Sequence, residues 1–144
     1  MIDTLSDFQH AIDSLDKLGF TKKTLGYGYI LEFLTTCSVV NMHMNTATEF
    51  IEQTAEKHKV SKRSVEDNMT TTFLNVWQGP DAQLLHELFR TDNSETTVQK
   101  PKLRNMLIIL LLFVESQRHK NAIYADFFGY CLRNRVTIDF SSFA

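Results

Sequence analysis

The chain has 144 residues, the usual size of one domain, and its formal charge is −2 because 17 Asp and Glu outnumber 15 Lys and Arg. That balance excludes a general polycation but leaves room for a local basic patch of the kind that binds nucleic acid. The longest apolar run, residues 106–114, is far shorter than the roughly 20 residues of a membrane span, and residues 1–4 do not resemble a signal peptide. We therefore expect one cytoplasmic domain over residues 1–144, with no membrane partner.

The scarcity of helix-breaking Gly and Pro residues and the helical spacing of apolar residues predict an all-α, compact bundle of about six to seven helices. The chain holds only five Gly and two Pro. Two polar segments, residues 41–46 and 91–99, are expected to be loops, and the second is the best candidate for a mobile one. Residues 136–140 alternate like a strand but have no apparent partner strand. The expected helices span about 8–18, 27–40, 48–57, 61–77, 82–89, 102–118 and 122–133.

The helix expected over residues 102–118 is apolar around most of its girth. Such a helix is either central in the core or also part of a subunit interface, and both interpretations stay open. The residues that fill more than one of its faces are Met106, Ile109, Leu110, Phe113 and Val114.

Residues Thr48–Trp77 have the pattern of a helix-turn-helix. Ala55 is small enough for a second helix to approach, Val60 is expected to fill the turn, and Ser61 is expected to cap the second helix. The apolar residues Val65, Met69, Phe73 and Val76 share one face of that helix. The opposite face carries Arg63, Ser64, Asp67, Asn68 and Thr71. This arrangement lays the second helix in a DNA major groove, although many helical hairpins share the pattern.

Positive charge gathers in two places. Residues 56–63 hold four cations against one carboxylate, and residues 100–120 hold five against one. Such clusters can meet phosphates, which supply most non-specific affinity for DNA. Solvated helix ends are the alternative explanation for them.

No motif for catalysis, metal or cofactor binding is present. Met42-His43-Met44 has soft ligands but no Cys or second His nearby, and His86-Glu87 lacks the second His of a zinc-protease helix. Gly26-Tyr27-Gly28 lacks the third glycine and the preceding strand of a dinucleotide loop. Cys37 and Cys131 are expected to be buried thiols in a reducing compartment. We therefore expect that the protein is not an enzyme and that it binds no metal and no cofactor.

Three blocks of the sequence carry a family resemblance when taken in order. They are Leu18-Gly19 with Gly26-Tyr27-Gly28-Tyr29 and Glu32; Ala55 through Val65-Glu66 to Trp77; and Leu88-Phe89 followed by Lys100-Pro101. Together they resemble the C-terminal DNA-binding (effector) domain of the sporulation response regulator, stage zero sporulation protein A. The resemblance covers about residues 15–115 and leaves residues 116–144 as a C-terminal extension.

The resemblance implies an all-α helix-turn-helix domain that binds double-stranded promoter DNA and regulates transcription in sporulation. Members normally follow a phosphorylatable receiver domain. No strand–helix alternation precedes Leu18, so we expect a stand-alone version. The residues expected to face the groove are Ser61, Lys62, Arg63, Ser64, Asn68 and Thr71, and those expected to meet phosphates are Lys59, Lys100 and Lys102.

The chain departs from the family at the reading surface. The family's recognition helix carries arginines at the positions matching Ser64, Asp67 and Thr70, and Asp67 beside Glu66 would repel a phosphate. The alternative is a non-DNA-binding protein-interaction module, which is an antagonist or partner of a regulator. Whether the chain forms a homodimer or binds a protein partner stays open. The surface potential around Asp67 discriminates between them, because a continuous positive band favours DNA and a broken one favours protein.

Overall fold

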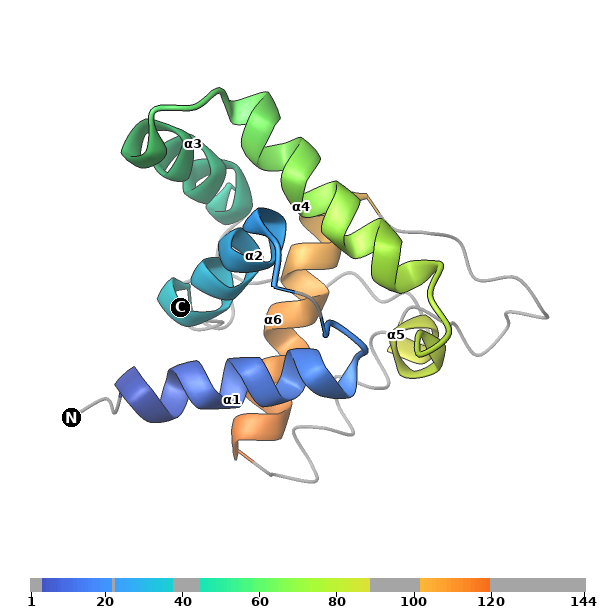
Figure 1. Cartoon of the computed structure of the whole chain (residues 1–144). Helices are drawn as coiled ribbons and strands as arrows, with labels where there is room; N and C mark the ends of the chain where they lie inside the picture. Colours follow the sequence, from blue (N-terminus) through green and yellow to red (C-terminus); the bar gives the residue numbers. More distant parts are fainter. Residues whose placement is uncertain (1–3, 22, 38–44, 89–101, 120–144) are drawn as a thin grey trace.

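The computed structural model describes residues 4–21, 23–37, 45–88 and 102–119, and within these ranges the chain forms six α-helices and no strand (Figure 1). This confirms the all-α prediction. The loop expected over 91–99, the last helix expected over 122–133 and the strand-like residues 136–140 lie outside the described residues. The helices are α1 (Thr4–Lys17), α2 (Leu25–Thr36), α3 (Thr46–His58), α4 (Lys62–Trp77), α5 (Gln83–Leu88) and α6 (Leu103–His119).

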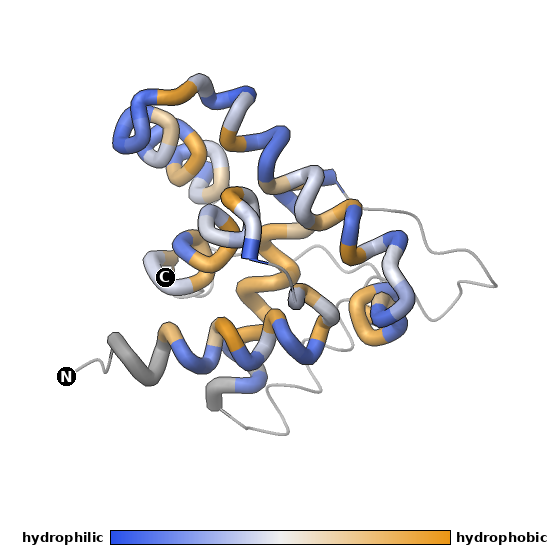
Figure 2. Tube along the Cα trace, in the orientation of Figure 1, coloured by the Kyte–Doolittle hydropathy of each residue, from blue (hydrophilic) through white to orange (hydrophobic). Residues whose placement is uncertain are grey.

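Helix α6 is the centre of the bundle, and α1, α2, α3 and α4 all pack against it. Figure 2 shows its apolar residues continuing through the middle of the molecule, while α3 and α4 turn hydrophilic residues outward. Of the apolar residues that the sequence indicates for this helix, Ile109 is only half-buried. No helix among the described residues is both long enough and apolar enough to span a bilayer. The fully buried residues of α6 include Met106, Leu107, Leu110 and Leu111.

Helices α2 and α4 make the most extensive helix–helix contact of the described residues. The contact depends on Gly26, because a Cβ there would overlap the carbonyl oxygen of Asn68 and Oγ1 of Thr72. Thr24, the N-cap of α2, accepts a hydrogen bond from the Tyr27 N–H, and its Oγ1 lies 2.7 Å from Thr72 Oγ1. At Gly26 the backbone of α2 therefore meets the backbone of α4 at Asn68 directly.

The sequence-based ends of α2 are wrong by a few residues. The helix starts at Leu25 and ends at Thr36, four residues before the expected Val40, and Cys37 has extended backbone (ψ 151°). The hydroxyls of Thr35 and Thr36 both bond back to the carbonyl of Glu32, a local competition that disfavours further helix. The polar segment expected to last to Thr46 is also too long, since α3 begins there.

Cys37 is half-buried rather than buried as expected, and it is a free thiol. Burial raises the pKa of this thiol, and a hydrogen bond with Thr36 partly offsets the effect. The thiol therefore stays protonated at neutral pH, which disfavours the nucleophilic thiolate form. Cys131 lies outside the described residues.

The end of α4 follows the sequence pattern. Gln78 is the C-cap, and its N–H donates to the Leu74 carbonyl 3.0 Å away, so the helix stops before Gly79-Pro80 as predicted. His86 then ties α5 to this end, with Nε2 2.8 Å from the Trp77 carbonyl oxygen and its ring beside the indole.

Candidate nucleic-acid interface

A three-residue turn, Lys59–Ser61, joins α3 to α4. Lys59 adopts left-handed backbone (φ 57°). The Lys59 N–H donates to the Glu56 carbonyl, and the Val60 N–H donates over 3.0 Å to the Ala55 carbonyl. These two bonds form the closing motif that typically ends a helix with a glycine in the Lys59 position. The turn is therefore tightly defined although it contains no glycine.

Ser61 caps α4 as predicted. Its Oγ accepts a hydrogen bond from the Ser64 N–H at 3.0 Å, and its backbone is extended. Val60, in contrast, does not fill the turn, because its side chain is 38% exposed. The prediction is wrong: the buried apolar residues on either side of the turn are Ala55 on α3 and Val65 on α4.

Helix α4 is amphipathic in the predicted sense. Val65, Met69 and Phe73 are buried, and Val76 is half-buried. The exposed face carries Arg63, Asp67 and Thr71 at successive turns.

Two predicted groove residues lie on the flank of α4 rather than on its outer face. Ser64 and Asn68 are half-buried on the side toward α2, where Gly26 contacts Asn68. The Asn68 amide donates to the Ser64 carbonyl over 2.8 Å. This hydrogen bond uses one of the two amide N–H groups, so the other N–H and the amide oxygen remain for a bidentate contact with adenine.

The cations at the start of α4 are paired within the domain. Lys62 Nζ lies 3.9 Å from Glu52 of α3, and Arg63 Nε lies 3.7 Å from Asp67 one turn along. All four side chains are at least half exposed, so each pair contributes little to stability and opens easily. The positively charged surface at the turn therefore extends only as far as Asp67. The whole α3–turn–α4 unit, residues 46–77, holds four cations against five carboxylates.

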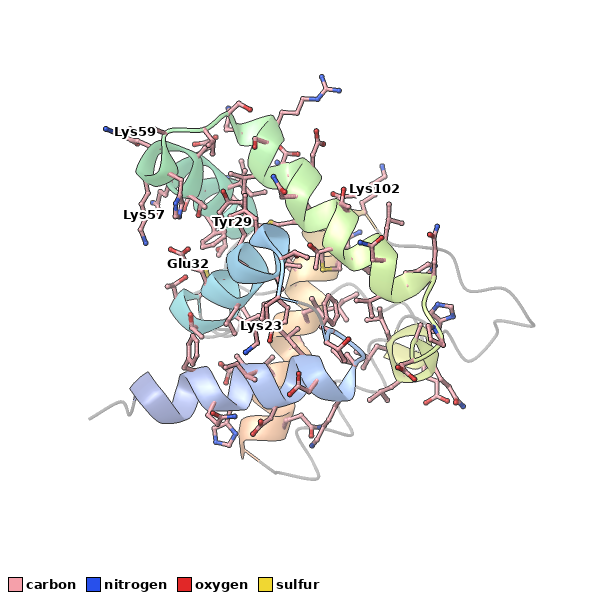
Figure 3. The ribbon with its side chains drawn as sticks, viewed as in Figure 1. Lys23, Tyr29, Glu32, Lys57, Lys59 and Lys102 are labelled. Atoms are coloured by element: carbon pink, nitrogen blue, oxygen red, sulfur yellow. The ribbon has the colours of Figure 1, made fainter. Side chains whose placement is uncertain are left out.

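Two of the three residues predicted to contact phosphates lie in the part of the chain that the structure describes. Lys59 and Lys102 are exposed and have no ion pair within the described part of the chain, and Figure 3 shows Lys59 projecting from the α3–α4 turn. Lys102 immediately precedes α6. Lys100 lies outside the described residues.

Arg104 is a positioning residue that sequence reasoning missed, because it was counted only as part of a basic cluster. Its Nε donates to Thr48 Oγ1 over 2.8 Å, and its Nη1 lies 3.6 Å from Glu66. One side chain of α6 thus joins the start of α3 to the first half of α4. No local pattern reveals this contact, since its partners are distant in sequence.

The last turn of α3 is held against α2. Glu32 lies 2.9 Å from Lys57 and 3.9 Å from His58, and the His58 ring packs edge-on against Tyr29 (Figure 3). Together with Arg104 at the other end of α3, this cluster sets the angle at which α3 presents the turn. The helix-turn-helix is therefore a fixed part of the bundle.

Replacing Lys59 with glycine tests the strained turn. We expect the free energy of unfolding to rise by about 1 kcal/mol, because a left-handed backbone costs a residue with a Cβ roughly that much. Lys59→Ala removes the same charge but keeps the strain, so it is the matched control and gains nothing. Urea unfolding followed by circular dichroism measures both, and equal stabilities of the two variants would contradict the argument.

A short helix, a tight turn and an amphipathic second helix with an exposed polar face define a helix-turn-helix domain of the kind that binds DNA. A family model for the C-terminal domain of sporulation initiation factor Spo0A matches residues 11–113. The chain belongs to this family, which confirms the resemblance found in the sequence and makes the domain one of a DNA-binding regulatory class rather than an enzyme class. Searches of curated proteins and of solved structures find no significant match.

Proposed function

We propose that this protein is a DNA-binding transcription regulator that acts in the cytoplasm on double-stranded promoter DNA. The observation that carries the proposal is the α3–turn–α4 unit of a family of DNA-binding effector domains, with the polar face of α4 open to solvent. The stand-alone organisation expected from the sequence, without a receiver domain, stays a prediction.

The proposed contact surface has two parts. Lys59 and Lys102, which have no ion pair among the described residues, meet phosphates on either side of α4, and Lys100 is proposed to join them. The exposed face of α4 enters the major groove. The proposed contacts are Lys62, Arg63 and Thr71 on this face, the cap residue Ser61, and Ser64 and Asn68 on the flank.

A second candidate function, a protein-interaction module, is favoured by one observation. The positive band at the turn is broken at Asp67, and Lys62 and Arg63 already have carboxylate partners in the domain. A surface of alternating charge suits a protein partner, such as a regulator of the same family or a second copy of this chain. DNA remains the leading proposal because these exposed pairs open at little cost.

The test is a fluorescence-anisotropy titration of the whole protein with labelled duplex DNA at several salt concentrations. We expect binding whose log affinity falls linearly with log salt, because each phosphate contact releases counterions and contributes about 0.9 to the slope. Three to five contacts therefore predict a slope of about −2.7 to −4.5.

The control ligand is a neutral peptide-nucleic-acid duplex, which offers bases without phosphates and should not bind. An absence of binding to DNA even at low salt would overturn the proposal. A titration with the purified sporulation response regulator would then test the second candidate, for which saturable binding is the expected result.

A further inference from the structure

The two carboxylates on α4 occupy different environments. Glu66 turns toward α6, where its oxygen lies 3.6 Å from Arg104 Nη1. Asp67 lies in the middle of the exposed face, one turn after Arg63 and one turn before Thr71, and its side chain is 71% exposed. Only Asp67 is therefore presented outward, at the place where a docked α4 would be deepest in a groove.

A carboxylate in this position has a restricted set of partners in DNA. It only accepts hydrogen bonds, so it repels phosphate and must face base edges instead. In the major groove cytosine offers the N4 amino donor, to which Asp and Glu bind, whereas thymine O4 and guanine O6 are acceptors. We infer that Asp67 is a specificity residue that selects cytosine, an inference that rests on the proposed DNA-binding function.

The neighbouring guanidinium extends the prediction to a second base. Arg63 is 90% exposed and lies one helical turn from Asp67. Arginine reads guanine through O6 and N7. One turn advances about 5.4 Å along the helix, or roughly one and a half base-pair steps of 3.4 Å. The preferred site therefore holds a cytosine one or two base pairs from a guanine.

The remaining bases should follow a definite order of preference at the position that faces Asp67. Adenine keeps an amino donor at N6 and should be the second choice at the cytosine position. Thymine and guanine place an acceptor oxygen against the carboxylate, so they should bind worst, by about tenfold relative to cytosine. Asp67 thereby changes which site the domain reads, in place of the arginine that the family resemblance implies at this position.

The experiment selects bound duplexes from a pool with a randomised core and compares the wild type with Asp67→Ala and Asp67→Asn. We expect Asp67→Ala to lose the preference at one position while it keeps the others, with tighter binding to unselected DNA. Asp67→Asn should move that position toward adenine, because an amide pairs with adenine N6 and N7. Glu56→Ala removes the same charge from an exposed position of α3 and should keep the cytosine preference.

The outcomes separate this inference from the proposed function. A wild type that enriches no cytosine, or an Asp67→Ala variant with an unchanged base preference, would overturn the role of Asp67 while leaving DNA binding intact. If the wild type retains no duplex at low salt, both the inference and the proposed function fail. Unfolding midpoints within error of the wild type would show that the variants are folded.

Discussion

Replacing Gly26 with alanine should destabilise the domain by about 3 kcal/mol, because the added methyl group has no space between α2 and α4. A Cβ at this position overlaps the Asn68 carbonyl oxygen and lies 2.6 Å from the Asn68 carbonyl carbon. These are backbone atoms of a helix and cannot rotate away. The two helices must therefore separate, which also breaks the Thr24–Thr72 hydrogen bond.

Gly28 is the matched control, since it lies two residues later in the same helix and nothing comes within 4 Å of its Cβ position. Gly28→Ala should stabilise the protein by about 0.5–1 kcal/mol, because alanine is the better helix former. Urea unfolding followed by circular dichroism measures both changes. Two variants with the same sign of effect would mean that the close approach of α2 to α4 does not exist in solution.

The second large effect is expected from the double variant Lys62→Ala, Arg63→Ala. In the proposed complex both side chains enter the groove, where each cation also neutralises about one phosphate charge, so their loss lowers the log affinity by about 1.8 at 0.1 M salt, roughly 60-fold, and reduces the salt slope by about 1.8. The domain should stay folded, because the pairs with Glu52 and Asp67 are exposed and contribute little to stability. Anisotropy titrations at three salt concentrations give both quantities.

The control for that variant removes two cations elsewhere. Lys17 and Lys23 are exposed and neither belongs to the proposed contact surface, and Figure 3 shows Lys23 between α2 and α1. Lys17→Ala, Lys23→Ala has the same net charge as the test variant. It should lose less than about threefold in affinity at 0.1 M salt, because neither side chain belongs to the proposed contact surface and salt screens the remaining long-range attraction. Equal losses in both variants would show that only net charge matters and would remove the start of α4 from the interface.

The features that the sequence predicted correctly depend on residues close together along the chain. Ser61 caps α4 through an atom three residues away, and the stop at Gly79-Pro80 is a local break. The buried face of α4 follows from apolar residues that recur at helical spacing. Periodicity and capping chemistry are local properties, so one sequence suffices to read them. The ends of α2 were less certain because the Thr35 and Thr36 hydroxyls compete with the backbone.

The sequence by itself therefore determined the all-α class, the approximate positions of the six described helices, the helix-turn-helix and the family to which the chain belongs. Only the tertiary structure decided how the reading face is built. Gly26 meets Asn68 from another helix, and Arg104 reaches Thr48 and Glu66. These relations join residues tens of positions apart. They follow from how whole helices fill space, which no periodicity along the chain encodes.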